Sequence, residues 1–386
     1  SNLHEFDNII LIGTNIKTEF PILTVRFNDA VKKNTNIYSY HFINMPEDFD
    51  VKKNFVMNNS DLLSVFQDHS LESCRGKKNL VIIGPNITYF YNQSLFFQAI
   101  EAFASNINAT VGYLTDFCNS TSGWILGNVP HRLPGGKEIK TPGYNTSEML
   151  EGNLSSMIFF NLDPDNDFYN SSALINALQK SSCNVFFTSF ITPIIEKYAD
   201  FVVPISTYVE TDGSYINIEG KFQTFSKVVQ ADKSTFEGWH ALNELSKLNG
   251  LDDHSIVSIR NDLVSLLSNV DFTKNKKIDA KAYPKNDKSM IHKNTLRHIY
   301  STDQIVRRAK SLNQTNQAIN RQIYVSKDLV KDNPNKKTLS IEENEKVFKI
   351  SDFKVKDDLP NKTIVYSSSF DNKFTESKST FVSLKK

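Results

Sequence analysis

Short apolar runs of strand length, alternating with amphipathic stretches, are the feature that most constrains this chain. The run "NIILIG" ends at Gly13, and residues 21–31 then carry apolar side chains at helical spacing. The same strand-like pattern returns at residues 37–43, 79–84 and 109–114. Strands that alternate with helices predict a parallel sheet with helices on its faces. We therefore predict a first α/β unit over residues 1–120.

A stretch rich in Gly and Pro, residues 121–150, interrupts this rhythm and predicts a crossover loop. Apolar strand-like runs then resume as "MIFFNL", "NVFFTSF" and "FVVPIS". Turn-linked extended segments follow, and then two amphipathic stretches at residues 236–248 and 255–268. This pattern predicts a second α/β unit over residues 151–270.

From residue 271 to residue 386 the chain becomes polar, and Lys and Asn are prominent. Sustained apolar patterns are few, so we expect an extended, interface-forming arm that lies over partners rather than a third core. Deleting this arm is expected to leave the α/β body folded.

Charge and hydropathy exclude two classes of partner. The 44 Lys and Arg residues nearly cancel the 43 Asp and Glu residues, so no global positive field would hold a nucleic acid. The apolar runs are much shorter than the roughly 20 residues that a membrane helix needs. The chain opens at Ser1 without an Arg-rich presequence or a signal peptide, so we expect targeting to have been removed or never needed.

Metal-ligating residues show no clustered spacing. The three cysteines, Cys74, Cys118 and Cys183, are far apart and odd in number, which predicts neither a C-x-x-C site nor a disulfide framework. The closest histidines, His292 and His298, are six residues apart, which is not a same-face helical spacing. We expect no metal-binding residue.

Two strand ends, at Gly13 and Gly84, are the places where a dinucleotide phosphate would bind. Neither carries G-x-G-x-x-G; Glu19 places a negative charge near the first turn, and Pro85 removes a backbone donor from the second. Nucleotide binding at either turn stays open as a minor alternative. We predict no cofactor-binding residue.

Catalytic motifs are also missing from the sequence, which contains no G-x-S-x-G, Walker A or H-E-x-x-H pattern. Glu210, Asp212 and Glu219 lie close together near two glycines, and paired carboxylates could do acid/base work. Turn chemistry explains them better, because Asp212-Gly213 is a turn signal. We predict no catalytic residue.

One long string, "YADFVVPISTYVETDGSYINIEGKFQ" at residues 198–223, resembles the molybdopterin oxidoreductase family. That family has Ala-Asp before an apolar strand ending in Pro, then Glu, Asp-Gly-Thr-Tyr, Asn-x-Glu-Gly-Arg and Gln. The matching residues are Ala199, Asp200, Pro204, Glu210, Asp212, Gly213, Tyr215, Asn217, Glu219, Gly220 and Gln223, with Ser214 for Thr and Lys221 for Arg. Asn15, Pro21, Leu23, Arg26 and Trp239 also correspond. The resemblance implies two Rossmann-like parallel-sheet units.

A second phrase, "IYSTDQIVRRA" at residues 299–309, resembles the C-terminal part of the large iron-sulfur subunit family of mitochondrial respiratory complex I. The residues in register are Tyr300, Thr302, Asp303, Ile305 and Arg307. The whole resemblance spans residues 8–312. In this family the N-terminal half holds the cysteine-ligated iron-sulfur clusters, and this chain matches only the other half. The cluster-bearing half would be a separate gene product or a processed piece of the same one.

The resemblance implies a scaffold with no cofactor and no chemistry of its own, on the matrix side of the mitochondrial inner membrane. Its implied partners are the N-terminal iron-sulfur half, other subunits of the peripheral arm and a small thioredoxin-fold accessory subunit. Two alternatives remain: a domain pair of an active molybdopterin-dependent oxidoreductase, and a free-standing Rossmann-like nucleotide binder.

Overall fold

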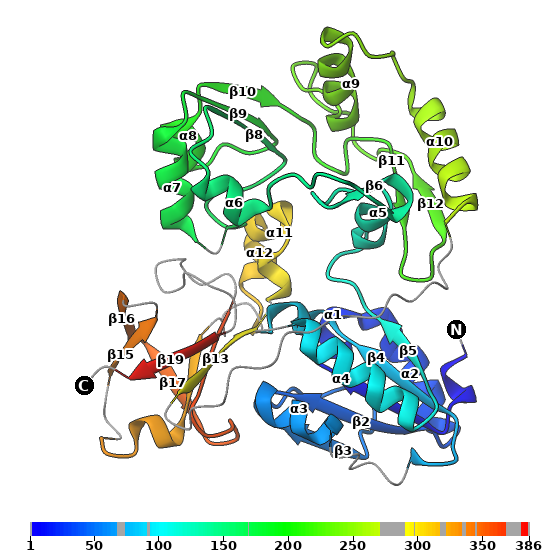
Figure 1. Ribbon diagram of the computed structural model, residues 1–386, viewed down its shortest axis with the longest axis vertical. Coiled ribbons are helices and arrows are strands. Elements are labelled where there is room, and N and C mark those ends of the chain that lie inside the picture. The colour runs from blue at the N-terminus through cyan, green and yellow to red at the C-terminus, as the bar shows by residue number, and fades with distance from the viewer. Residues whose placement is uncertain are drawn as a thin grey trace. The chain divides into compact units, whose positions relative to one another are not determined.

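The predicted alternation of strand and helix forms a five-stranded parallel sheet in the computed structural model of the chain (Figure 1). The structure describes residues 2–67, 74–90, 93–168, 170–270, 290–296, 298–316, 322–333, 337–343, 346–367 and 380–384. The chain divides into two compact units, Ser1–Leu114 with Lys276–Lys386 and Thr115–Asn275. Each unit is described by itself.

The sheet of the first unit has the strand order β3-β2-β1-β4-β5, and all of its strand pairs are parallel. Its strands are β1 (Asn8–Ile12), β2 (Asn36–His41), β3 (Lys53–Val56), β4 (Asn79–Ile83) and β5 (Ala109–Tyr113). The helices around it are η1 (Leu3–Glu5), α1 (Ile16–Glu19), α2 (Pro21–Lys32), α3 (Asn59–Gln67), η3 (Pro85–Tyr89) and α4 (Gln93–Asn106). The α/β class that the sequence predicts is therefore confirmed.

Both faces of this sheet are buried, as is usual for parallel sheets. On β1, Ile10 and Ile12 pack with α3 and α4, whereas Ile9 and Leu11 pack with α2. Because side chains alternate between the two faces of a strand, the five consecutive buried residues of β1 contribute to the cores on both faces of the sheet. Helix α4 buries Phe96, Ile100 and Phe103, whereas Phe97 is only partly buried.

The expectation of a polar arm without a core over residues 271–386 is wrong for the described part of that stretch. Seven strands form one sheet there, in the order β16-β15-β19-β13-β18-β14-β17. They are β13 (Ile291–Leu296), β14 (Ile323–Ser326), β15 (Thr338–Glu343), β16 (Lys346–Ser351), β17 (Phe353–Lys356), β18 (Thr363–Ser367) and β19 (Thr380–Leu384). Short helices η5 (Ile299–Ser301), α11 (Gln304–Arg308), α12 (Lys310–Asn313) and η6 (Lys327–Val330) lie between them in sequence. Residues 271–289, where the arm was predicted to begin, lie outside the described residues.

The physical reason for this correction is the short period of the apolar residues. In "TLSIEE" of β15, Leu339 and Ile341 are buried while polar residues alternate with them. In such a period-2 pattern, a few apolar residues are enough to form the buried face of a strand. The average composition of the segment can therefore be polar although it contributes to a core.

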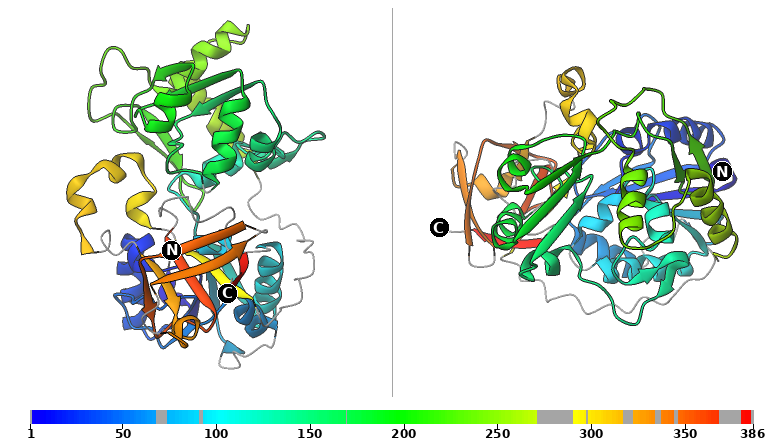
Figure 2. Two further views of the ribbon diagram at one scale, coloured as in Figure 1. Left: turned by 90° about the vertical axis from the view of Figure 1, so that its left-hand side faces the viewer. Right: turned by 90° about the horizontal axis from the view of Figure 1, so that it is seen from above.

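The seven-stranded sheet also contributes to the core of the α/β part. Leu359 and Val365 belong to the same buried cluster as the side chains of β1, α3 and α4. Thr363 donates to Asn58 at 2.7 Å, and Asn59 donates to Asn294 at 3.2 Å. Figure 2 shows the two parts side by side, so removing the seven-stranded sheet is expected to expose the α/β core, contrary to the deletion expectation above.

A buried ion pair lies inside the seven-stranded sheet. The Lys293 ammonium lies 2.6 Å from the Glu343 carboxylate, and both side chains are at most 2% exposed. The Lys293 Nζ also lies 5.7 Å from the centre of the Tyr366 ring. Removing one member of a buried pair leaves the other charge in a medium of low dielectric constant.

Replacing Lys293 with Met is expected to lower the free energy of unfolding by about 3–5 kcal/mol, whereas the double change Lys293→Met with Glu343→Met recovers most of the loss. Urea unfolding followed by circular dichroism measures both variants. The exposed Lys349 of β16 is the control, since Lys349→Met should cost less than about 1 kcal/mol. Equal losses at Lys293 and Lys349 would contradict the prediction.

The second unit contains a smaller parallel sheet, β10-β9-β8, and two hairpins. Its strands are β6 (Arg132–Leu133), β7 (Lys137–Glu138), β8 (Ser156–Phe160), β9 (Cys183–Thr188), β10 (Phe201–Pro204), β11 (Gly213–Ile216) and β12 (Phe222–Phe225). Its helices are α5 (Ser120–Ile125), η4 (Pro134–Gly136), α6 (Thr146–Glu151), α7 (Ser171–Lys180), α8 (Pro193–Tyr198), α9 (Gly238–Leu248) and α10 (Ile256–Ser268).

The stretch expected as a crossover loop, residues 121–150, carries regular structure. It includes most of α5, the β6–β7 hairpin and α6. Gly135 and Gly136 both have positive φ values, 80° and 72°, which let the chain turn between β6 and β7.

Within the described residues, no helix is long and apolar enough to cross a membrane.

Candidate functional site at the switch point of the first sheet

The strand order of the first sheet reverses between β1 and β4, and ligands of open α/β sheets bind at such a switch point, beyond the carboxyl ends of the strands. The residues at this point are Gly13, Thr14 and Asn15 after β1, and Gly84 and Asn86 after β4. All five are buried. These are the two turns that the sequence marks as places for a phosphate.

The two turns lie directly against each other. Gly13 has a φ of +65°, and its carbonyl accepts from the Asn86 N–H at 3.1 Å. A Cβ atom added to Gly84 would lie 2.2 Å from the Thr14 Cβ, so only glycine allows this approach. The ends of β1 and β4 are therefore in direct contact.

The Glu19 side chain accepts hydrogen bonds from three groups of these turns. Its carboxylate accepts from the Thr14 hydroxyl at 2.6 Å and from the Asn15 N–H at 3.1 Å. It also accepts from the Asn86 side-chain amide at 2.9 Å. Thr14, Asn15 and Asn86 are each at most 2% exposed. One carboxylate thus links the end of β1 to the end of β4.

The next backbone N–H groups, at the start of α1, are also satisfied within the chain. The Glu47 carboxylate accepts from the Ile16 and Lys17 N–H groups, both at 2.8 Å. The Asn15 side chain accepts from the Thr18 N–H at 3.1 Å. The first N–H groups of a helix have no intrahelical partner and commonly bind anions. From Asn15 to Thr18, these groups already donate to side chains of the protein.

Burial, with smaller contributions from the Glu19 and Asp48 carboxylates, raises the pKa of Glu47 from its ordinary value of 4.5 to about 7. The two N–H groups that Glu47 accepts from act in the opposite direction. The Lys17 ammonium pairs with Asp48 at 2.5 Å. Glu47 therefore titrates near neutral pH.

Between about pH 4.5 and 7 the folded chain keeps a proton on Glu47 that the unfolded chain has released, so this group's contribution to stability falls as pH rises through that window. Above about pH 7 it no longer changes. Glu47→Gln removes the titration, so the wild type should lose stability relative to this variant between pH 4.5 and 7. Urea unfolding at several pH values measures the difference, with Glu101→Gln on α4 as the control. A pH-independent difference would refute the assignment.

The three carboxylates considered for acid/base work each take part in local turn structure. Glu210 accepts from the Thr207 N–H and hydroxyl at 2.9 and 2.7 Å, and Asp212 accepts from the Lys227 N–H at 2.9 Å. Glu219 pairs with Lys221 at 3.4 Å. Each of these three carboxylates therefore has a local structural partner.

Other residues of the family motifs have structural contacts. The Trp239 indole donates to Glu237 at 2.8 Å, and Glu237 also accepts from Thr211 and Lys227. Asp303 caps α11 by accepting from the Ile305 and Val306 N–H groups, both at 2.9 Å. Arg26 lies on the exposed side of α2, in an open groove of about 390 Å³ beside Ile22 and Val25.

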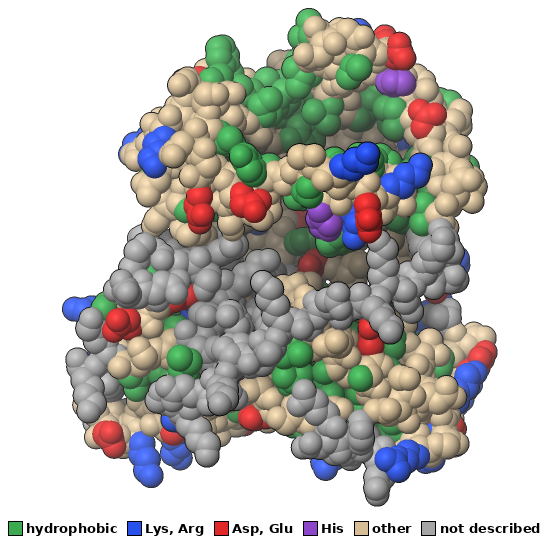
Figure 3. Space-filling model, viewed as in Figure 1, with side chains coloured by type: hydrophobic (Ala, Val, Ile, Leu, Met, Phe, Trp, Pro, Cys, Tyr) green, Lys and Arg blue, Asp and Glu red, His purple; other side chains and the backbone are tan. Residues whose placement is uncertain are grey.

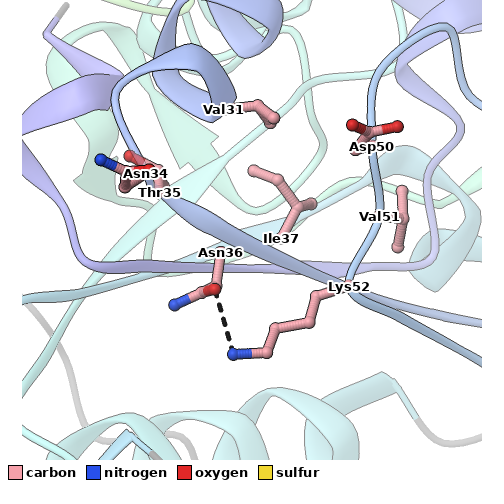
Figure 4. Close-up of a pocket in the computed structure, with 8 residues that line it drawn as sticks. All are labelled: Val31, Asn34, Thr35, Asn36, Ile37, Asp50, Val51 and Lys52. Atoms are coloured by element: carbon pink, nitrogen blue, oxygen red, sulfur yellow. Dashed lines mark hydrogen bonds between the residues drawn. The ribbon is translucent and has the colours of Figure 1, made fainter.

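A second cavity, of about 290 Å³, lies at the opposite edge of the same sheet (Figure 4). Asn36, the first residue of β2, lines it together with Asp50 and Lys52. The Lys52 ammonium donates to the Asn36 side chain at 3.1 Å. This cavity is at the amino ends of the strands, away from the edge where ligands of such sheets bind.

Metal-ligating side chains form no cluster of three or more within the part of the chain that the structure describes. Of the three cysteines, Cys74 is buried, Cys118 is exposed and Cys183 is half-buried. Burial lowers the pKa of His292.

Sequence reasoning identified Glu19 as a charge near the first turn but missed Glu47. Glu47 lies in the loop after β2, outside any recognisable motif, and reaches α1 only through the fold. Nothing in the local sequence could have found it.

Several known proteins are similar to this chain in sequence. The family model described as molybdopterin oxidoreductase matches residues 1–248. The "NADH-ubiquinone oxidoreductase 78 kDa subunit, mitochondrial" of Candida albicans is 24% identical over 248 residues, which are 64% of this chain and 32% of that protein. A Staphylococcus haemolyticus protein named for formate dehydrogenase is 24% identical over 149 residues, 33% of this chain and 15% of that protein.

Among solved structures, acetylene hydratase from Pelobacter acetylenicus has a similar fold, with a TM-score of 0.55 and 11% sequence identity. The similarity covers 95% of this chain and 71% of that one. The chain spans about a third or less of the length of the Candida albicans and Staphylococcus haemolyticus relatives.

Proposed function

The chain belongs to the molybdopterin oxidoreductase family, and we propose that within this family it is a cofactor-free scaffold of mitochondrial respiratory complex I. In this role it is one part of the large iron-sulfur subunit, in the peripheral arm, on the matrix side of the inner membrane. It performs no chemistry of its own. Electrons pass through the iron-sulfur clusters of a partner chain.

The observation that carries this proposal is the occupation of the switch point by Glu19. Molybdopterin bears a phosphate group, and a phosphate needs free N–H or hydroxyl donors. At this edge of the first sheet the donors of Thr14, Asn15 and Asn86 already bind the Glu19 carboxylate. A second carboxylate, from Glu47, lies at the start of α1. A phosphate would have to compete with these carboxyl groups for the same donors, so these residues do not fit the group.

Support for complex I in particular comes from two resemblances. One is the similarity to the Candida albicans subunit over 64% of the chain. The other is the phrase at residues 299–309, in which Asp303 caps α11 and Arg307 follows within that helix. The second phrase is what separates this proposal from the formate dehydrogenase relative.

The proposed partners are the cluster-bearing N-terminal half of the subunit, neighbouring peripheral-arm subunits and a small thioredoxin-fold subunit. An apolar face of the second unit supports a role in binding. Ile158, Val185 and Phe201 lie in one row across β8, β9 and β10, and Ile158 and Phe201 are 61% and 63% exposed. Figure 3 shows hydrophobic side chains gathered over these strands and α9. Parallel sheets are normally covered on both faces, so we propose that the cluster-bearing half covers this row.

Phe201→Asp is expected to reduce the amount of the cluster-bearing chain that co-purifies with this protein by at least about tenfold, since it places a charge in a buried apolar interface. The fold should persist, because Phe201 is mostly exposed. Val228, which is 80% exposed and lies after β12, offers a matched control in Val228→Asp. Equal co-purification with both variants would argue against this surface.

The proposed function itself is tested by purifying the native assembly through this chain. Mass spectrometry should identify complex I subunits, including a cluster-bearing chain, and metal analysis should find iron without stoichiometric molybdenum or tungsten. Isolation of the chain without any complex I subunit would overturn the proposal.

The second candidate is a domain pair of an active molybdopterin-dependent oxidoreductase. The formate dehydrogenase relative favours it. Stoichiometric molybdenum or tungsten in the purified assembly would select this candidate. Thermal stabilisation by NADH or ATP would instead select a nucleotide binder, because a ligand that prefers the folded state must stabilise it.

A further inference from the structure

We propose that the outer edge of β8 receives an extended apolar strand of the cluster-bearing chain, which extends the three-stranded sheet of the second unit across two chains. The identity of the donor chain rests on the proposed function, whereas the open edge is a feature of this chain itself. Backbone pairing at the edge of the sheet would add to the face contact proposed for the row of Ile158, Val185 and Phe201.

Strand β8 lies at an edge of its sheet and pairs with β9 alone among the strands that the structure describes (Figure 1). The Asn161 N–H donates to a carbonyl of β9 at 2.7 Å, and the Ser155 carbonyl accepts from the residue before β9 at 2.8 Å. Successive residues of a strand direct their N–H and C=O groups to opposite sides, so every second residue between these two also faces β9. The N–H and C=O groups of Ser156, Ile158 and Phe160 therefore face the open edge.

The edge of β8 has none of the sequence features that protect exposed strands from pairing, such as charges and Pro. Its sequence is Ser-Met-Ile-Phe-Phe. By contrast, β16 and β17, the edge strands of the seven-stranded sheet, carry Lys349 and the pair Lys354 and Lys356. The opposite edge strand of the small sheet, β10, ends in Pro204, whose carbonyl accepts from the Phe236 N–H at 3.1 Å. Pairing with another strand is therefore expected at β8.

The two faces beside this edge determine which kind of strand fits. On one face Met157 and Phe159 are buried in the core that α7 covers, and on the other Ile158 and Phe160 are exposed. An added strand places successive side chains alternately beside these two faces. Both faces are apolar next to β8, so the added strand needs consecutive apolar residues, as in the fully buried strands of parallel sheets.

The cluster-bearing chain is the donor that these observations favour. The matched residues make up 32% of the Candida albicans subunit, so most of that protein lies outside the similarity and contains other segments. The proposed function already places the cluster-bearing chain on the row that begins at Ile158, beside this edge. A second copy of this chain is the other occupant, and a two-fold axis would pair its β8 antiparallel with the first.

Hydrogen–deuterium exchange tests the pairing directly, with the native assembly compared with the full chain alone and with residues 155–161 resolved by fragmentation. The outward N–H groups of Ser156, Ile158 and Phe160 should exchange at least about tenfold more slowly in the assembly, because each gains an acceptor. The N–H groups of Met157 and Phe159 face β9, so they should be slow in both samples and serve as the internal control. Equal exchange of the outward groups in both samples would overturn the proposal.

A proline variant separates the backbone from the side chain. Ile158→Pro removes an outward donor, whereas Ile158→Ala keeps it, and both variants shorten the apolar side chain. Proline is tolerated in an edge strand where the missing N–H faces solvent, so the chain alone should fold. We expect at least about tenfold less cluster-bearing chain to co-purify with Ile158→Pro than with Ile158→Ala. Equal amounts would contradict pairing at this edge.

If circular dichroism shows that Ile158→Pro does not fold, Ser156→Pro against Ser156→Ala decides in the same way, because Ser156 is the first residue of β8, where proline is also tolerated. Here too, equal co-purification of the cluster-bearing chain would overturn the proposal.

Failure of the pairing and failure of the proposed function give different results. A wild-type assembly that contains the cluster-bearing chain but shows no slowed exchange in β8 would overturn the pairing alone. A wild-type assembly without that chain would overturn both. Slow exchange of the outward groups in the chain alone, together with a native mass of two copies, would assign the edge to a second copy and overturn the donor proposed here.

Discussion

Backbone N–H groups that emerge at the end of a strand and the start of a helix must find acceptors, and this constraint organises the first unit. The turn after β1 leaves the N–H groups of Asn15 through Thr18 without partners inside α1. Three side chains, Glu19, Glu47 and Asn15, satisfy them. Glu19 also bonds to Asn86, so the same acceptor connects the ends of β1 and β4. Internal contacts therefore join the two strand ends at this edge of the sheet.

The fold of the sheet and the contacts at its switch point depend on different residues. The sheet depends on apolar residues such as Ile10 and Ile12, which pack on helices irrespective of what lies at the carboxyl edge. The residues at that edge are polar and contribute little to the apolar core. A family fold can therefore persist while the chemistry of its edge changes, and fold similarity to acetylene hydratase says nothing about reaction.

Much of the α/β part could be predicted from the sequence because β1 and β4 are runs of consecutive buried residues, which is the strongest signal of a parallel strand. The seven-stranded sheet could not, because its buried residues, such as Leu339 and Ile341, alternate with polar ones over short segments. At the switch point, Glu19 was recognisable as a charge in the first turn. Glu47 was not, because only tertiary folding brings its loop to α1.

The division of the chain has a consequence for its synthesis. The first unit starts at the first residue but includes residues near the end, and the whole second unit lies between them. Leu359 and Val365 cover part of the core that the first five strands form. A ribosome releases that core long before it makes the residues that cover it, and transiently exposed apolar surface promotes aggregation. The five-stranded sheet therefore stays partly exposed until residues 359–365 have been synthesised. A chaperone that shields this apolar surface would act during that interval.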